Sequence, residues 1–249
     1  TLFRAYDSLG RPSTTQLTLD GTAQTYSTTY DANGRVASVT YPSGLVLLYV
    51  YTATGYLCRT ADNTGSPTCS TGGGSQIFWT ANSRDAEMHL TQASAGNGVV
   101  TNQAFDPNTG LIQTIQSGPI GSPTSIANFA YAFDTLGNLS SRQDVTENYV
   151  ERFCYDPINR LTNYAIGATC TATGTKTVGY DALGNITSKT DVGTYNYSGV
   201  GAGPHAVTSI VGTVNGVINP VFGYDANGNQ TCEYAASGGN CTSAATRLI

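Results

Sequence analysis

Aspartate recurs along this chain directly after an aromatic residue, and carboxylates are common acid–base groups in enzymes. The copies run from Tyr6-Asp7 to Tyr224-Asp225. Two carboxylates that met in one cleft could hydrolyse a polar bond. Regular repetition along the whole chain instead favours a turn-capping role for every Asp, so we predict no catalytic residue and no enzyme.

Histidine and metal chemistry are also not predicted. His89 and His205 lie far apart in the sequence, and no motif presents either as a base or ligand. Asp225–Asn229 is similar to the start of a calcium loop, but Ala236 stands where such a loop needs a bidentate Glu. We expect no metal and no cofactor; calcium binding by this loop is the alternative.

The six cysteines form three local pairs: Cys58 with Cys69, Cys154 with Cys170, and Cys232 with Cys241. Zinc sites need close C-x-x-C pairs or nearby His, and neither is present. Six cysteines allow many pairings, so connectivity is not fixed by sequence. We predict local disulfides, which would indicate an oxidising compartment, with free thiols or a metal as alternatives.

All of these aspartates belong to one short motif: an aromatic residue, Asp, two or three further residues, then Gly or Asn. Clear copies lie about 25 residues apart. The predicted turn residues are Tyr6, Asp7 and Gly10; Tyr30, Asp31 and Gly34; Phe105, Asp106 and Gly110; Phe133, Asp134 and Gly137; Tyr155, Asp156 and Asn159; Tyr180, Asp181 and Gly184; and Tyr224, Asp225 and Gly228.

When Tyr51 is counted in the series, two gaps are about twice as long as the others, from Tyr51 to Phe105 and from Tyr180 to Tyr224, and they predict degenerate copies. Tyr51–Gly55 is a weaker copy, and we expect others near Phe78–Trp79 and Tyr195–Ser198. The stretch Ser83–Ser94 is expected to be a variant hairpin, with a short helix as the alternative. Residues 1–249 would then form one repeat domain of about ten units.

The motif predicts a tight β-hairpin. Asp suits the first position of a type I turn, and Gly three residues later supplies the left-handed conformation that closes the hairpin with a bulge. Because an isolated hairpin is only marginally stable, neighbouring hairpins must pair edge to edge. We therefore predict an all-β fold of antiparallel hairpin repeats in one continuous, spiralling sheet. Equivalent aromatic residues would stack as a ladder along it.

Composition supports a folded chain. Charged residues make up 11% and hydrophobic residues 39%, with 16 Tyr and 29 Gly. The net charge is −5 and the 11 Lys and Arg are scattered, which argues against nucleic acid. The longest apolar run, Leu45–Tyr51, is too short to span a bilayer. The chain starts at Thr1 in mid-pattern, so we expect a processed piece or a fragment.

The Tyr-Asp copies resemble the YD repeats of Rhs proteins, which teneurins and the C component of insecticidal toxin complexes share. The resemblance covers essentially the entire chain, and Gly203–Ile210 also looks like a stretch between late repeats of bacterial members. It implies a long antiparallel sheet that spirals into a hollow shell. In toxin-bearing members the shell encloses a toxic domain, and in teneurins it is a scaffold for cell adhesion.

The sequence and this resemblance leave three functions open. The first is a structural, non-catalytic segment of an extracellular Rhs-type shell, surface fibre or filament. The second is a module that binds glycans or a partner cell, or part of a cocoon around a toxin. An enzyme ranks last. Expected partners are further repeats or copies of the chain and a glycan or cell surface, with neither nucleic acid nor membrane insertion.

Overall fold

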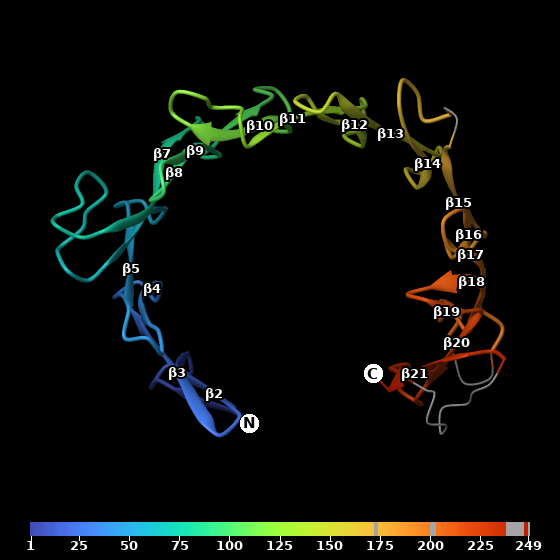
Figure 1. The fold of residues 1–249 in the computed structure, drawn as a ribbon, viewed down its shortest axis with the longest axis horizontal. Coiled ribbons are helices and arrows are strands. Elements are labelled where there is room, and N and C mark those ends of the chain that lie inside the picture. Colours follow the sequence, from blue (N-terminus) through green and yellow to red (C-terminus); the bar gives the residue numbers. More distant parts are fainter. Residues whose placement is uncertain (172–173, 200–202, 238–246, 249) are drawn as a thin grey trace. The chain divides into compact units, whose positions relative to one another are not determined.

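The computed structural model describes residues 1–171, 174–199, 203–237 and 247–248. Within them every regular element is a β-strand, and Figure 1 shows these strands as a succession of short hairpins in chain order. The prediction of an all-β fold built from antiparallel hairpins is confirmed. Ser83–Ser94 lies in a hairpin and not in a helix.

The chain forms two compact units, and the first comprises residues 1–130 and 144–146. Each of its strands pairs antiparallel with the next one along the chain. The strands are β1 (Leu2–Tyr6), β2 (Pro12–Leu19), β3 (Thr22–Tyr30), β4 (Val36–Thr40), β5 (Val46–Tyr51), β6 (Leu57–Asp62), β7 (Ile77–Arg84), β8 (Leu90–Ala95), β9 (Val99–Phe105), β10 (Ile112–Pro119) and the first part of β11 (Ala127–Phe133).

The second unit comprises residues 131–143 and the described residues from 147 onward. Its strands are most of β12 (Leu139–Asp144), then β13 (Tyr149–Tyr155), β14 (Leu161–Ile166), β15 (Lys176–Tyr180), β16 (Ile186–Lys189), β17 (Gly193–Asn196), β18 (Ser209–Val214), β19 (Val217–Ile218), β20 (Pro220–Tyr224), β21 (Gln230–Ala235) and β22 (Arg247–Leu248). From β13 to β18 each strand pairs with the next; β18 pairs with both β19 and β20, and β20, β21 and β22 follow in order.

Each unit is a single layer. Contacts between strands in the described residues join neighbours in the hairpin series, and no second sheet packs on the first. Most strand residues are consequently half-buried, and the few fully buried ones include Ala61, Val178 and Cys232. Stability must therefore come largely from contacts between adjacent strands, as in other repeat proteins.

The meander sorts the turns into two groups. In an antiparallel series of strands, successive turns alternate between the two ends of the strands. In the first unit the motif turns follow β1, β3, β5, β7 and β9, so they lie at the same end. The turns at the opposite end have other chemistry: Asp20 and Gly21 have φ of 47° and 78°, which is the type I′ pattern of a two-residue hairpin turn.

Candidate functional site

Each motif aspartate is bonded within its own turn, as Asp156 illustrates. Its N–H donates to the carbonyl oxygen of Arg160 at 2.9 Å, and the N–H of Asn159 donates to the carbonyl oxygen of Asp156 at 2.9 Å. The carboxylate accepts the N–H groups of Ile158 and Arg160 at Oδ1 (3.1 and 2.9 Å) and Arg160 Nε at Oδ2 (2.7 Å). Both carboxylate oxygens therefore fix the turn.

These bonds lower the pKa of Asp156, and the N–H of Arg160 is the largest cause, because each favours the ionised carboxylate. The same direction holds at every other motif aspartate: Asp7, Asp31, Asp106, Asp134, Asp181 and Asp225. A hydrogen-bonded carboxylate with a lowered pKa suits a structural role better than proton transfer, which needs a pKa near the working pH.

The residue that closes each turn is left-handed. Gly184 has φ of 87° and Asn159 has φ of 64°. The pairing register then shifts directly before the motif aromatic, between Gly179 and Tyr180 and between Cys154 and Tyr155. One extra residue is thus inserted on one strand, as in a bulge. Asp106 has one more loop residue, so its N–H bonds to the carbonyl oxygen of Leu111.

The motif tyrosines join one repeat to the next. Tyr180 Oη donates to the carbonyl oxygen of Leu161 at 2.9 Å, and Leu161 is the residue that follows the turn of the preceding repeat. The same bond recurs as Tyr30 to Pro12, Tyr51 to Val36, Tyr155 to Leu139, Tyr197 to Ile186 and Tyr224 to Val207, at 2.8–3.0 Å. We call this bond, with the ring contact described next, the tyrosine stitch.

A cation often lies over the tyrosine ring. The Arg160 guanidinium carbon lies 4.6 Å from the centre of the Tyr180 ring, and it comes from the turn of the preceding repeat. Arg11 lies over Tyr30 at 4.1 Å in the same way, and Arg35 over Tyr51 at 4.3 Å. The expected ladder of directly stacked motif aromatics is wrong for these repeats, because a guanidinium takes the place beside each ring.

The variant hairpin expected at Ser83–Ser94 contains a motif turn whose key residues are replaced. The turn Asp85–His89 closes the β7–β8 hairpin, with Met88 left-handed at φ of 69°. Arg84 stands where the aromatic residue is expected, lies over the Tyr56 ring at 5.1 Å, and donates from Nη2 to the carbonyl oxygen of Leu57 at 3.3 Å. The cation and the ring have exchanged places. The degenerate copy expected near Phe78–Trp79 lies here instead.

His89 occupies the arginine position of that turn. Its Nδ1 lies 2.9 Å from Asp85 Oδ2, and its ring stacks on Phe105 of the next motif, with centres 4.4 Å apart. The spacing of Asp85 and His89, four residues apart as in Asp7 and Arg11, is the signal that could have revealed this repeat.

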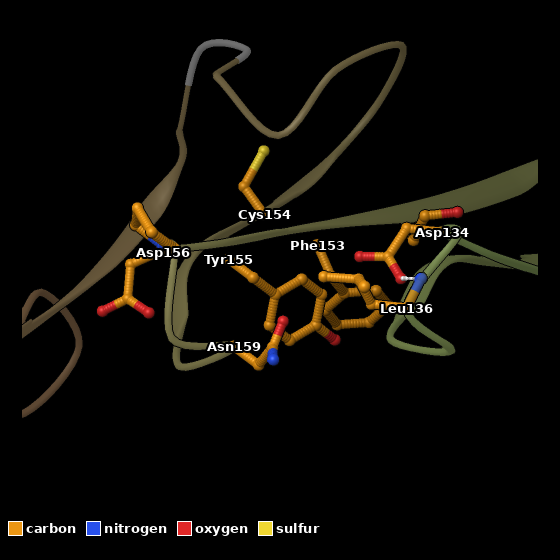
Figure 2. Close-up of a pocket in the computed structure, with 9 residues that line it drawn as sticks. Asp134, Leu136, Phe153, Cys154, Tyr155, Asp156 and Asn159 are labelled. Atoms are coloured by element: carbon orange, nitrogen blue, oxygen red, sulfur yellow. Dashed lines mark hydrogen bonds between the residues drawn. The ribbon is translucent and has the colours of Figure 1, made fainter.

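A hollow of about 470 Å³ lies between the turns of Asp134 and Asp156 in the second unit. Figure 2 shows the rings of Phe153 and Tyr155 in it, with the Cys154 sulfur on the other side of the strand. Asp134 and Asp156 line the same hollow, but Asp134 Oδ1 already accepts the N–H of Leu136 at 2.9 Å. The two carboxylates line one cavity while each stays bonded within its own turn.

Three asparagines in potential glycosylation sequences also cap turns. The side-chain nitrogens of Asn138, Asn185 and Asn229 each donate to the motif aspartate at 2.9 Å. Asn185 is 6% exposed and its oxygen lies 2.6 Å from His205 Nδ1. The Asp225–Asn229 loop thus has its carboxylate engaged by Asn227 and Asn229.

Two disulfides join local cysteine pairs. They link Cys58 with Cys69 and Cys154 with Cys170. Each disulfide ties a loop at the strand ends opposite the motif turns to a strand residue, which is Cys58 of β6 or Cys154 of β13. The third predicted pair includes Cys241, which lies outside the described residues.

Two further features are absent from the described residues. No group of three or more His, Cys, Asp or Glu is placed to hold a metal ion there. Nor is there a helix, in that part of the chain, of the length and apolarity needed to cross a membrane.

Residues 30–67 match the family model described as RHS Repeat, and this segment contains the Tyr30-Asp31 and Tyr51 motifs. No curated protein matches the chain by sequence.

Solved structures with a similar fold include the crystal structure of TcdB2-TccC3-Cdc42, at 14% identity and a TM-score of 0.55. This alignment covers 92% of the present chain and 15% of that chain. A Tc holotoxin pore from Photorhabdus luminescens aligns with 14% identity over 91% of the present chain and 15% of its own, with a TM-score of 0.46. The chain spans about one seventh of the length of these structures.

The family match lies on the motif that first suggested it, and the fold around it is the expected series of antiparallel hairpins. The prediction of an Rhs-type repeat from the Tyr-Asp motif is therefore confirmed at residues 30–67, and the rest of the chain shares the hairpin fold of the similar structure.

Proposed function

We propose that the chain is a non-catalytic, extracellular scaffold: a segment of the wall of an Rhs-type shell or fibre. The observation that carries this proposal is the tyrosine stitch. Each stitch uses the side chain of one repeat and the backbone of its neighbour, so the recurring tyrosine of the motif connects successive repeats. The motif carboxylates likewise serve the turns.

A wall must resist opening between its repeats, and this can be measured. Hydrogen exchange of the purified chain should show the amides of β14 and β15 opening together, because the Tyr180 stitch spans the repeat boundary. Tyr180→Phe should raise their exchange rates. Independent opening of the two strands in the unaltered chain would contradict the scaffold role.

The extracellular location is supported by the two disulfides, since such bonds persist mainly in oxidising compartments. Alkylation of thiols in freshly lysed producing cells, followed by mass spectrometry, tests this. Oxidised Cys58 and Cys154 in the secreted fraction are the expected result. Reduced cysteines in a protein retained in the cytoplasm would refute the location.

The resemblance of the motif to Rhs repeats, whose toxin-bearing members enclose a toxic domain, supports a more specific role as part of a cocoon around a toxin. The chain aligns with only 15% of the chain in the TcdB2-TccC3-Cdc42 structure. Further repeats of the parent chain, or copies of this one, would complete such a wall. Protease protection of a linked cargo, compared with the same cargo alone, is the measurement that separates a cocoon from an open fibre.

A further inference from the structure

Several motif tyrosines share one pair of neighbours: a carboxylate in the preceding turn and an arginine bonded to it. At Tyr180 the arginine is Arg160, which lies 4.6 Å from the ring centre and donates from Nε to Asp156 Oδ2 at 2.7 Å. The same arrangement recurs as Asp7 with Arg11 over Tyr30 and as Asp31 with Arg35 over Tyr51. The chain itself therefore shows which group this ring face accepts, namely a guanidinium held by a carboxylate.

The repeat of Tyr155 has an asparagine at the arginine position. Asn138 stands four residues after Asp134, and its Nδ2 donates to Asp134 Oδ2 at 2.9 Å and to Asn159 Oδ1 at 3.0 Å. The side chain of asparagine is uncharged and shorter than that of arginine. Asp134 is thus bonded to a neutral amide where Asp156 is bonded to a guanidinium.

The hollow of about 470 Å³ lies in this same repeat, between the turn of Asp134 and the ring of Tyr155. Its apolar lining comes from Phe153, Leu136 and Pro157, and Figure 2 shows the two rings. The volume is within the range of about 300–1,000 Å³ that is typical of small-ligand sites. The hollow therefore combines aromatic and aliphatic groups with a carboxylate that has no cationic partner in its own turn.

Negative charge is in excess in the hollow. Asp156 is paired with Arg160 at 2.7 Å, whereas the carboxylate of Asp134 accepts neutral N–H groups of its own turn. These bonds, chiefly the one from the Asn138 side chain, lower the pKa of Asp134, so it is ionised at neutral pH. Burial and then the charge of Asp134 raise the pKa of Tyr155, so that charge acts at the ring. A cation would be attracted by the carboxylate and by the ring face.

A second asparagine at the arginine position shows what the hollow adds. Asn185 follows Asp181 by four residues, but its Nδ2 donates to the carbonyl oxygen of Pro204 at 3.1 Å and its oxygen lies 2.6 Å from His205 Nδ1. Asn185 is 6% exposed. Another segment of the chain covers this position, so the replacement of arginine by asparagine does not by itself open a site.

We propose that the hollow between Asp134 and Tyr155 binds a guanidinium compound, with its cation over the Tyr155 ring and its N–H groups directed to Asp134. Its hydrocarbon part would lie against Leu136 and Phe153. The Tyr155 hydroxyl donates to the carbonyl oxygen of Leu139 at 2.9 Å, which fixes the ring before binding and lowers the entropic cost of association. A guanidinium suits the site better than an ammonium, because it is planar, less strongly hydrated and stacks on aromatic faces.

The test follows ring signals of the purified full chain, with disulfides intact, by NMR after carbon-13 labelling of Tyr and Phe. The probe is Nα-acetylarginine methylamide, and its uncharged counterpart is Nα-acetylcitrulline methylamide. The arginine probe should shift the signals of Phe153 and Tyr155 saturably, with half-saturation between about 0.1 and 10 mM, as one cation–ring contact and a charge-assisted hydrogen bond predict. The citrulline compound should produce no saturable shift.

A blocked Gly-Arg-Gly tripeptide distinguishes the two sources of a guanidinium. Tighter binding of the tripeptide than of the single residue would assign the site to arginine within a peptide. Equal or weaker binding would assign it to a free compound. Both results require the same contact with the Tyr155 ring.

Asn138→Arg is the decisive variant, because it gives this repeat the arginine that Arg160 supplies to Tyr180. It should weaken binding of the probe at least tenfold. Asp134→Asn should weaken it about fivefold or more, since the charge that attracts the cation is lost. Asn229→Arg is the matched control: it adds the same charge at the same position of another motif turn, outside the hollow. It should leave affinity within about twofold, well under a tenfold step.

Three results would each overturn the proposal. They are the absence of saturable shifts up to about 50 mM probe, well above the expected range, equal binding of the citrulline compound, and unchanged affinity in Asn138→Arg. Circular dichroism and melting of each variant establish that it is folded. The scaffold role rests on the tyrosine stitches and does not depend on this outcome.

Discussion

The hydroxyl of Tyr180 donates to the carbonyl oxygen of Leu161 at 2.9 Å, across the boundary between two repeats. The same ring carries Arg160 of the preceding turn on its face. One side chain thus joins the strand, the turn and the backbone of two repeats.

Replacing Tyr180 by Phe keeps the ring and removes this hydrogen bond. We expect the free energy of unfolding of the second unit to fall by about 1 kcal/mol, because the carbonyl of Leu161 loses its partner while the arginine contact stays. Urea denaturation measures the change. Tyr149→Phe, at a tyrosine that is 43% exposed, serves as the control and should alter stability little. Equal effects of the two variants on the free energy of unfolding would show that the Tyr180 hydrogen bond does not stabilise the second unit.

Acid should weaken the motif turns. The pKa of Asp156 is lowered in the folded chain from its usual 3.8, chiefly by the N–H of Arg160. The unfolded state then binds the proton more readily, so the stabilisation is fully present above 3.8 and is lost as pH falls through the folded pKa. Denaturation midpoints should be flat from neutral pH to pH ~5 and decline below ~4.

Asp156→Asn tests the origin of this decline, because its side chain cannot ionise. The variant should be less stable than the original at pH 7 and should lose less on acidification. A variant with the full acid sensitivity of the original would show that other groups control it.

Each disulfide should stabilise its own unit. Cys58 and Cys69 close a separation of 11 residues, and Cys154 and Cys170 one of 16. Loops of this size contribute about 3 kcal/mol by restricting the unfolded chain. The double variant Cys58→Ala with Cys69→Ala should therefore speed hydrogen exchange in β6 and β7 and leave β13 and β14 nearly unchanged. Faster exchange in both units would contradict this local action.

Gly184 is needed for its backbone conformation. Its φ is 87°, and a methyl group there would meet no atom within 4 Å. Gly184→Ala should cost about 1–2 kcal/mol, the penalty for a left-handed L-residue. Gly121→Ala is the matched control, since it also has open space and lacks a positive φ. Calorimetric melting of both variants gives the comparison, and equal stability would exclude a conformational role.

The turns could be predicted because their chemistry is local. Asp156 and Asn159 are three residues apart, and the bonds between them follow from that spacing. The stitch could not, because Tyr180 meets Leu161 only after the strands have paired in one register. The bonds from Gln92 to Asn102 and from Gln116 to Asn128 could not be predicted either, since these residues lie on strands that pair only in the folded sheet. The repeat at Asp85 does not match the motif, because Arg84 stands where the motif has an aromatic residue.

The exchange between Tyr56 and Arg84 constrains how such a chain can evolve. These positions lie in different hairpins, and they hold the ring and the guanidinium in the opposite order to Tyr51 and Arg35. Replacing Tyr56 or Arg84 alone with a residue of the other kind would remove the cation–ring contact at this boundary. The order can therefore be reversed with the contact kept only if both residues change.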